Sequence, residues 1–298
     1  MKRLLPTFLV VLAFHSVHAQ QAASFRTSDN ETLHYTAIGK GPRVVLLWGG
    51  PGYNVSMMKP WADSLSRNFE CILFDQRGTG LSSGVKLDST TINIKRAADD
   101  IEDLRKHLGE SQLTVCGTSW GGALCQIYAA FYPKKVKKIV LVSTLGPDLS
   151  LINAFVDNIN MRRHPGDIDS LKYWNTQPDS KTAEIKRALF GFIPYFYDQR
   201  IARSILPKIL FSGAKNKTMG DLMWKDLFKN YDVKTQLKAY KGECAIIQPR
   251  QDVIPAGETS AQILGILPQT KIYVIEKCGH FPDLEKPGEL YKLLRQAL

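Results

Sequence analysis

Residues 117–122, Gly-Thr-Ser-Trp-Gly-Gly, constrain the fold of this chain more than any other stretch. A β-branched apolar run enters the motif at residues 113–116, and a helix-like apolar run leaves it at residues 123–131. Strand, sharp turn and helix, in that order, is the context in which G-x-S-x-G exposes its serine at the top of a sheet. Glycine on both sides lets the strand and helix backbones pass close together, because no Cβ intervenes. The stretch predicts Ser119 as a nucleophile on a strained turn.

The G-x-S-x-G pattern occurs twice in the chain, so the pattern alone does not identify the nucleophile. Residues 80–84, Gly-Leu-Ser-Ser-Gly, also fit it, but residues 85–91 have no helical period. The strand–turn–helix context is therefore present only around Ser119. We expect Ser82 to be a loop residue.

The base expected beside Ser119 is His280, which follows the strand predicted at residues 271–275. Sites in open α/β sheets form at the carboxyl ends of the strands, so His280 is placed to reach the serine. The other histidines lie in the N-terminal segment, an early hairpin, the end of a surface helix and a helical insertion: His15, His18, His34, His107 and His164. We expect none of them to act as the base.

The acid expected to orient His280 is Asp252, just past the strand predicted at residues 243–247. A carboxylate in this role fixes the histidine tautomer and stabilises the imidazolium. Serine, acid and histidine follow one another along the chain in the order expected for this class of sheet. Two carboxylates close to the histidine, Asp283 and Glu285, are predicted to have helix-start or surface roles.

Two backbone N–H groups are candidates to stabilise an oxyanion. One belongs to Trp120, the residue after the serine. The other is expected in residues 49–52, Gly-Gly-Pro-Gly, because glycines let main-chain N–H groups approach a substrate closely. We favour Gly50 over Gly49, since its N–H lies nearer the turn that Pro51 fixes. A plain Gly-Pro turn is the alternative interpretation.

The pattern of strands and helices around these motifs predicts an α/β fold. After a hairpin at residues 24–36, strands are expected at residues 43–47, 70–74, 113–116, 138–142, 243–247 and 271–275, the first two of them buried on both faces, and helices at 93–108, 258–266 and 284–298. Strands that alternate with helices favour a mostly parallel, doubly wound sheet with helices on both faces.

The alternation of strands and helices stops between residues 146 and 235, where helical periods dominate and no strong strand is found. We therefore predict a core in two parts, residues 20–145 and 236–298, interrupted by a helical cap at 146–235. Such an insertion lies above the carboxyl ends of the strands and can act as a lid.

Residues 1–19 are predicted to be a signal peptide. They combine a basic start, a short apolar run and a small-residue cleavage pattern at residues 17–19. The apolar run is too short to span a bilayer, and no other run in the chain is long enough. The mature protein is expected to be exported, periplasmic or secreted, without stable membrane insertion.

Charge and cysteine content exclude several classes of site. Removing Lys2 and Arg3 lowers the formal net charge from +11 to +9. The basic residues are scattered and form no aromatic-interleaved stripe, so no nucleic-acid partner is predicted. The five cysteines have no C-x-x-C spacing, which argues against a zinc site. Cys71, Cys116 and Cys244 lie in predicted strands and are interpreted as small buried hydrophobes.

These motifs together carry a family resemblance. The chain resembles the prolyl aminopeptidase (proline iminopeptidase) branch of the α/β-hydrolase superfamily. The residues that carry the resemblance are 49–52, 75–80 (Asp-Gln-Arg-Gly-Thr-Gly), 117–122, Asp252 and His280. The resemblance implies an α-helical cap, no metal or cofactor, and removal of an N-terminal residue, often proline, from small peptides. It also implies Gly50 and Trp120 as oxyanion donors.

The sequence departs from that branch at two positions. Trp48 stands where the family usually has a histidine, and Val253 stands where some members have a carboxylate that helps to bind the substrate amine. An aminopeptidase needs an anionic site for a free ammonium group. The predicted cap offers carboxylates, but none falls in a motif that carries the role over.

The sequence thus predicts a serine hydrolase acting on a small molecule or short peptide, and it leaves the oligomeric state open. A prolyl-aminopeptidase-like exopeptidase is favoured over a carboxylesterase. A catalytically silent relative that binds a ligand is the alternative from a different class. Dehalogenase and epoxide-hydrolase chemistry is disfavoured, because those sites need an aspartate at the position of Ser119.

Overall fold

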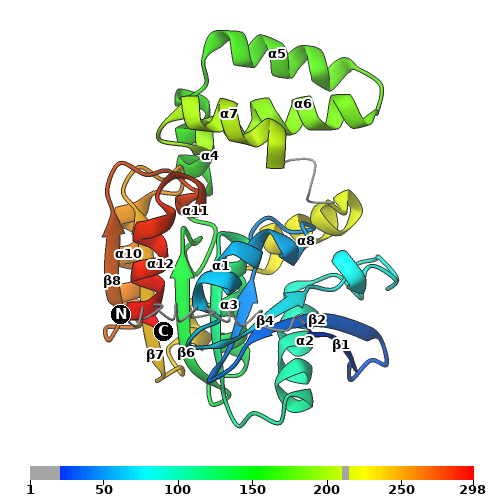
Figure 1. Cartoon of the computed structure of the whole chain (residues 1–298), viewed down its shortest axis with the longest axis vertical. Helices are drawn as coiled ribbons and strands as arrows, with labels where there is room; N and C mark the ends of the chain where they lie inside the picture. The colour runs from blue at the N-terminus through cyan, green and yellow to red at the C-terminus, as the bar shows by residue number, and fades with distance from the viewer. Residues whose placement is uncertain (1–20, 210–214) are drawn as a thin grey trace, which may run out of the picture.

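The computed structural model describes residues 21–209 and 215–298. An eight-stranded sheet runs through the molecule in the order β1-β2-β4-β3-β5-β6-β7-β8 (Figure 1). The strands are β1 (Gln21–Arg26), β2 (Thr32–Gly39), β3 (Arg43–Leu47), β4 (Glu70–Asp75), β5 (Leu113–Thr118), β6 (Val136–Val142), β7 (Glu243–Pro249) and β8 (Lys271–Ile275). β1 and β2 pair antiparallel, β2 pairs antiparallel with β4, and every pair from β4 to β8 is parallel.

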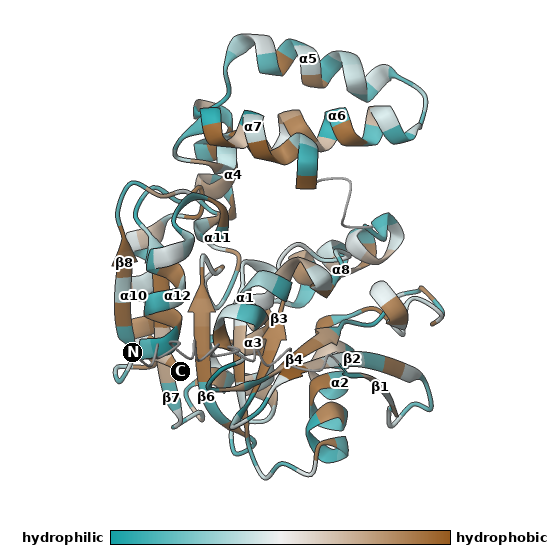
Figure 2. Cartoon of the chain, viewed as in Figure 1, coloured by the Kyte–Doolittle hydropathy of each residue, from teal (hydrophilic) through white to brown (hydrophobic). Residues whose placement is uncertain are grey.

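The inner strands are apolar on both faces, because helices cover both. Val45, Leu47 and Val115 belong to one core cluster, whereas Val44 and Leu46 belong to the other. This alternation is the two-residue period of a strand. Figure 2 shows the inner strands as hydrophobic along their length. The predicted doubly wound, mostly parallel sheet is therefore confirmed, and each of the predicted strands is present.

The core helices divide between the two faces. α1 (Lys59–Leu65) and α12 (Pro287–Ala297) pack on one face; α2 (Ile94–His107), α3 (Trp120–Phe131), α9 (Lys234–Leu237) and α10 (Ala256–Ile266) pack on the other. The closing helix predicted at residues 284–298 is wrong in one respect. Two helices, α11 (Pro282–Glu285) and α12, occupy this region, and Lys286 between them has non-helical dihedral angles. A residue before proline is disfavoured in the α region, and Pro287 starts the second helix.

The chain between β6 and β7 is helical, and its upper part stands apart from the sheet (Figure 1). It contains α4 (Ile152–Met161), α5 (Pro165–Thr176), α6 (Lys181–Phe192), the 3₁₀ turn η3 (Ile193–Tyr195), α7 (Gln199–Ile209) and α8 (Lys217–Asn230). Among its described residues only isolated bridges form, at Asp148 and Lys215. A small apolar cluster that includes Ile193, Phe196 and Leu206 holds the upper helices together.

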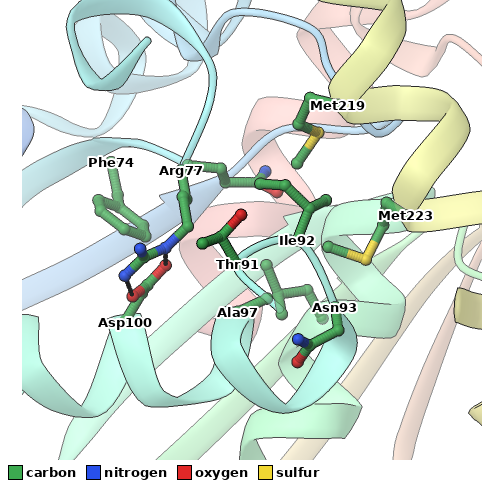
Figure 3. Close-up of a pocket in the computed structure, with 11 residues that line it drawn as sticks. Phe74, Arg77, Thr91, Ile92, Asn93, Ala97, Asp100, Met219 and Met223 are labelled. Atoms are coloured by element: carbon green, nitrogen blue, oxygen red, sulfur yellow. Dashed lines mark hydrogen bonds and ion pairs between the residues drawn. The ribbon is translucent and has the colours of Figure 1, made fainter. Parts of the chain in front are cut away.

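Helix α8 differs from the other helices of this region because it packs on the core. Met219, Met223 and Leu227 of α8 are buried in the larger core cluster. Figure 3 shows the two methionines facing Ile92, which lies in the loop just before α2. The helices α4–α7 therefore form the part that stands above the sheet, and α8 belongs with the core although it precedes residue 235.

A buried ion-pair cluster ties the β4 loop to α2 and the first hairpin. The Arg77 guanidinium donates to both carboxylate oxygens of Asp100 at 2.9 and 2.6 Å (Figure 3). It also donates to both oxygens of Asp29 at 2.9 Å. Burial alone would lower the pKa of Arg77, but the two carboxylates raise it above its ordinary value. The guanidinium is therefore a permanent cation that holds three segments together.

Substituting Arg77 by methionine is expected to lower the free energy of unfolding by about 3–5 kcal/mol, because Asp100 would be buried without its counter-ion. Urea unfolding followed by circular dichroism measures the change. The control is Asp63→Asn, which removes an exposed pair with Lys59 and should change stability by about 1 kcal/mol or less. Equal losses for the two variants would contradict this role for Arg77.

Three further predictions concern the signal peptide, membrane-spanning helices and the cysteines. Residues 1–19, the predicted signal peptide, lie outside the described residues. Within the described ranges, no helix is long and apolar enough to cross a membrane. The interpretation of Cys71, Cys116 and Cys244 as buried free thiols is confirmed, and Cys125 and Cys278 are buried and free as well. Burial raises the pKa of the Cys71 thiol to about 12, so this thiol is not a reactive one.

Candidate active site

The site forms where the parallel strands end together. Because β3, β5, β7 and β8 are parallel, their carboxyl ends lie at one edge of the sheet. The residues that follow these strands are the ones the sequence singles out. The glycine-rich loop follows β3, Ser119 follows β5, Asp252 follows β7, and His280 follows β8.

Ser119 occupies a strained turn between β5 and α3. Its φ of 55° lies in the left-handed region that side chains other than glycine rarely adopt. Its backbone N–H donates to the Val142 carbonyl at 3.0 Å, which ties the turn to β6. A Cβ on Gly117 would lie 2.1 Å from the Gly121 carbonyl oxygen, and one on Gly121 would lie 2.0 Å from the Leu47 carbonyl oxygen. Only glycine fits at either position, so the turn holds its serine as the motif predicts.

His280 and Asp252 form a buried pair. Nδ1 of the imidazole lies 2.8 Å from Oδ1 of the carboxylate. The backbone N–H of Ile254 donates to the same oxygen at 3.0 Å, and the Gln248 amide donates to Oδ2 at 3.3 Å. The histidine is 4% exposed and the aspartate is also 4% exposed. The acid is thus fixed on three sides, and an Nδ1–H of the imidazole would point at it, leaving Nε2 free to accept a proton.

Two hydrogen bonds join the loop that carries Asp252 to the loop that carries His280. The Gln251 N–H donates to the Cys278 carbonyl at 3.1 Å, and the Cys278 N–H donates to the Gln251 side-chain oxygen at 3.1 Å. These two bonds join residues directly next to Asp252 and close to His280. The relative position of acid and base is therefore set by local backbone contacts.

A cavity of about 250 Å³ lies between the strand ends and the upper helices. Ser119 and His280 both line it, together with Trp48, Gly49, Gly50 and Trp120 from the core. Phe155, Phe192, Tyr195 and Leu206 from the insertion complete a mostly apolar wall. The structure therefore brings Ser119, Trp120, Gly50 and His280 to one cavity, with Asp252 behind the imidazole.

The other candidates raised by the sequence have structural roles. Oγ of Ser82 accepts the backbone N–H of His34 at 2.9 Å within the turn η2 (Gly80–Ser82). The ring of His107 stacks on Phe25 with 5.6 Å between centroids. Nδ1 of His164 accepts from a backbone N–H at the start of α5. None of the three histidines lines the cavity.

The glycine loop after β3 approaches the serine closely. A Cβ on Gly49 would lie 2.8 Å from the Ser119 Cβ, so a side chain there would displace the serine. Gly50 has a φ of 58°, a region that favours glycine, and it lines the cavity beside Gly49.

Among the described residues no group of three or more histidine, cysteine or acidic side chains is placed to hold a metal ion.

Gln76 joins the two segments that carry the candidate oxyanion donors. Its amide Nε2 donates to the Trp48 carbonyl at 3.3 Å, next to the glycine loop. Its Oε1 accepts the indole N–H of Trp120 at 2.8 Å. The side chain is buried and follows β4 in the motif at residues 75–80. Sequence reasoning noted the motif but missed this contact, since spacing does not show which way a side chain points.

The predicted helix-start position of Glu285 in α11 is confirmed, but its carboxylate also has partners that the sequence did not predict. Its carboxylate accepts the backbone N–H groups of Gly279 at 2.7 Å, of Tyr197 at 3.0 Å and of Asp198 at 3.0 Å. It therefore clamps the segment after η3 to the loop that carries His280. Burial raises the pKa of Glu285, although these N–H groups oppose the shift.

Asp283 lies in the first turn of the short helix α11, so its predicted helix-start position is confirmed. It also lines the cavity, which the sequence did not predict. Burial raises the pKa of its carboxyl group to about 6. A signal was present in the sequence, because Asp283 and Glu285 lie three and five residues beyond His280. Helix-start preferences explained both residues equally well, so the signal was not used.

The upper helices contact both loops of the histidine–aspartate pair. The Tyr195 carbonyl accepts the backbone N–H of His280 at 2.7 Å. The Arg162 guanidinium donates to the carbonyls of Gln251 at 2.6 Å and Asp252 at 3.0 Å. A displacement of these helices would therefore disturb the loops of His280 and Asp252 directly.

Comparison with known proteins agrees with this geometry. Residues 42–287 match the family described as alpha/beta hydrolase fold. The chain belongs to this family. The predicted superfamily resemblance is therefore confirmed, and the site described above lies within the matched residues.

Relatives of this alpha/beta hydrolase include peptidases and lipases. A proline iminopeptidase of Heyndrickxia coagulans is 27% identical over 87% of this chain and 91% of its own length. The human monoacylglycerol lipase ABHD6 is 21% identical over 86% of this chain and 75% of its own. A proline iminopeptidase-related protein from Thermus thermophilus shares the fold, with a TM-score of 0.72 and 16% identity over 94% of this chain and 97% of its own. Family and relatives together identify this chain as a hydrolase.

Proposed function

We propose that this alpha/beta hydrolase is a serine hydrolase in which Ser119, His280 and Asp252 form a catalytic triad. The observation that carries the proposal is the shared cavity, lined by the elbow serine and by a histidine paired with a buried aspartate. Ser119 attacks a carbonyl while Nε2 of His280 takes its proton. Asp252 holds the imidazole tautomer and stabilises the imidazolium that forms.

Backbone groups supply the electrostatic part of the mechanism. The N–H groups of Trp120 and Gly50 are proposed to donate to the oxyanion of the tetrahedral intermediate. The N–H of Trp120 lies at the start of α3, where the helix dipole also favours negative charge. The tetrahedral intermediate collapses as His280 gives its proton to the leaving amine or alkoxide, and an acyl-enzyme remains on Ser119. A water that His280 activates then hydrolyses the acyl-enzyme, and the same histidine protonates Ser119 as it leaves.

The favoured substrate is a small peptide from which one N-terminal residue, often proline, is removed. Support comes from the proline iminopeptidase relative, which covers most of the chain, and from a cavity lined on its upper side by residues of α4, α6 and α7. A cavity covered in this way favours the end of a peptide over its middle, which is the geometry of an exopeptidase. We propose that α4–α7 act as the cap of this cavity.

A carboxylesterase is the second candidate, favoured by the wall of the cavity. Phe155, Phe192, Leu206 and Ile209 present apolar groups that suit an acyl chain. The lipase relative is consistent with this alternative.

Steady-state and burst-phase assays with proline p-nitroanilide and p-nitrophenyl butyrate separate the two candidates. The exopeptidase proposal predicts amide turnover with accumulation of an acyl-enzyme, and ester turnover alone would favour the esterase. Absence of amide turnover at every N-terminal residue tried would rule out the exopeptidase. Absence of both activities would favour a silent ligand-binding relative.

Gln76 is proposed to position both oxyanion donors. The variant Gln76→Leu keeps the volume but loses both hydrogen bonds, and we expect kcat to fall by up to about 100-fold with KM little changed, because small misplacements are costly in the transition state. Trp120→Phe removes only the bond to Oε1 and should lower kcat less. Because both variants disturb one network, their effects should not add in the double variant. Unchanged kcat in a folded Gln76→Leu enzyme would contradict the role.

Export remains part of the proposal. The basic start, short apolar run and small residues of 1–19 support cleavage after Ala19. Expression of the full chain followed by N-terminal sequencing of the exported protein tests it. A mature chain that begins at Gln20 is expected, and an uncleaved chain retained in the cell would contradict export.

A further inference from the structure

The cavity has one lysine in its wall, and the proposed mechanism does not use it. Among the described residues that line the cavity, Lys215 is the only lysine or arginine. The residue lies two positions before α8 and is exposed, so its side chain meets both the cavity and the solvent. Most of the remaining wall is apolar. Lys215 therefore gives the cavity a positively charged edge.

The backbone at Lys215 is fixed to the loop that carries the candidate oxyanion donor Gly50. Tyr53 and Lys215 form an isolated antiparallel bridge. The backbone N–H of Asn216 donates to the Gly52 carbonyl at 2.8 Å. These contacts join the segment before α8 to the residues that directly follow Gly50. The origin of the lysine side chain is therefore set relative to the place where the substrate carbonyl is proposed to bind.

The Lys215 side chain lies against Tyr53, which also lines the cavity. Its ammonium is 5.2 Å from the centroid of the Tyr53 ring, a cation–π contact. A Cβ on Gly220 would lie 3.7 Å from Cε of the lysine, so the aliphatic stem passes over a position of α8 that has no side chain. Burial and, to a smaller degree, the charge of Glu184 raise the pKa of Tyr53 to about 12. The phenol is therefore neutral and is no counter-ion for the lysine.

No carboxylate of the described chain pairs with Lys215. The lysine forms no ion pair among residues 21–209 and 215–298, whereas its neighbour Lys217 pairs with Asp221. Asp283 lines the same cavity, but the charged side chain that acts on its carboxyl group is His280 and not Lys215. An ammonium has three N–H donors, and an aromatic face takes up only part of them. Donors therefore remain for an anion that enters the cavity.

We propose that Lys215 binds a carboxylate carried by the substrate. The inference rests on the proposed function and assigns the substrate class as small esters or amides with a free carboxylate. The ammonium holds this group while the scissile carbonyl lies between Ser119 and the N–H of Gly50. A mostly apolar wall strengthens the attraction relative to water, and the exposure of Lys215 keeps the cost of desolvating the lysine low. A short peptide carries such a carboxylate on its leaving part.

The first test compares kcat/KM for two pairs of substrates that differ in charge. In p-acetoxybenzoate and p-acetoxybenzamide the difference lies on the leaving part, and in monophenyl adipate and phenyl adipamate it lies on the acyl part. At about pH 7.5 the carboxylates are ionised and the amides are neutral. In one of the pairs, the ratio of anionic to neutral substrate should be about 5- to 30-fold higher for wild type than for Lys215→Met, between the values of an exposed ion pair and a charged hydrogen bond. The pair that responds identifies the part of the substrate that the lysine holds.

Three variants separate the charge of Lys215 from its packing. Lys215→Met keeps the length of the side chain and loses the cation, with Lys215→Gln as a second variant if the first does not fold. Lys215→Arg keeps the cation and should retain most of the preference. Lys217→Met removes the same charge two residues away, from the exposed pair with Asp221, and should match wild type. Ratios that are equal in wild type and Lys215→Met for both pairs, or that fall equally in Lys217→Met, would overturn the proposal.

Binding without turnover distinguishes failure of this inference from failure of the proposed function. Hexanoate and hexanamide have nearly the same shape, and tryptophan fluorescence can follow both because Trp48, Trp120 and Trp224 line the cavity. The preference for hexanoate should be about 5- to 30-fold greater in wild type than in Lys215→Met. If it is, and no ester or amide is hydrolysed, the carboxylate site stands and the catalytic proposal is wrong. If esters are hydrolysed and neither assay depends on Lys215, the serine hydrolase stands and the carboxylate site is wrong.

Discussion

Substituting Ser119 by alanine is expected to lower kcat for p-nitrophenyl butyrate by roughly 10³- to 10⁶-fold, since no other group can form the acyl-enzyme. The alanine side chain keeps the volume of the turn, so β5 and α3 should be undisturbed. Any residual rate would come from the oxyanion donors and from binding alone. The measurement is steady-state hydrolysis by purified protein, with circular dichroism to show that the variant is folded.

The second match to the serine motif provides a matched control. Ser82→Ala removes a serine hydroxyl that accepts a backbone N–H in the turn η2. It should cost some stability, about 1–3 kcal/mol for an unsatisfied buried donor, but leave kcat within a few-fold of wild type. Loss of activity in Ser82→Ala with retention in Ser119→Ala would reverse the assignment of the nucleophile.

Substituting Asp252 by asparagine is expected to lower kcat by about 10⁴-fold, as in serine hydrolases where an amide replaces the acid. The amide can donate to Nδ1 of His280, which would put the ring proton on Nε2 and leave no base facing Ser119. An amide nitrogen placed toward Nδ1 cannot accept the Ile254 N–H that Oδ1 accepts, whereas the amide oxygen can still accept from Gln248, so some loss of stability is also expected. The rate is measured with p-nitrophenyl butyrate across a range of pH.

A nearby amide tests whether loss of charge or loss of geometry is responsible. Gln248→Leu removes the 3.3 Å contact to Oδ2 while the aspartate keeps its charge. We expect a much smaller fall in kcat, of about 10-fold or less, which is the value of one hydrogen bond. A fall as large as that in Asp252→Asn would show that the amide contact, and not the carboxylate, controls the imidazole.

The sheet and the elbow could be predicted from the sequence because their signals are local. Apolar runs such as residues 43–47 mark strands buried on both faces, and the structure has β3 at those residues. The sterics at Gly117 and Gly121 leave only glycine possible, so their spacing around Ser119 carries the turn geometry. The chain order of Ser119, Asp252 and His280 narrowed the candidates further, since strand ends in a parallel sheet share one edge.

Contacts between distant segments could not be predicted in the same way. Glu285 lies 88 residues from Tyr197 in sequence, and no periodicity indicates that its carboxylate reaches across to the cap. Gln76 faces Trp120 from a different strand, which depends on the order of β4, β3 and β5 in the sheet. Helix α8 has the same helical signal as the cap helices, and only its packing against the core separates it from them.

The position of Asp283 at the cavity was not predicted, because its sequence context is that of a helix start. Asp283 has the sequence context of a first-turn helical residue, and the structure does place it at the start of α11. Its position beside the cavity follows from the short loop after β8, which carries His280 into the same wall. One residue can thus satisfy a helix-start preference and line a cavity.

Labelling with a fluorophosphonate probe, followed by intact-protein and peptide mass spectrometry, tests the nucleophile and its base most directly. The account predicts one adduct, located on Ser119, that is absent from Ser119→Ala and forms far more slowly in His280→Ala. No adduct on the folded wild-type protein, or an adduct on another serine that persists in Ser119→Ala, would contradict it.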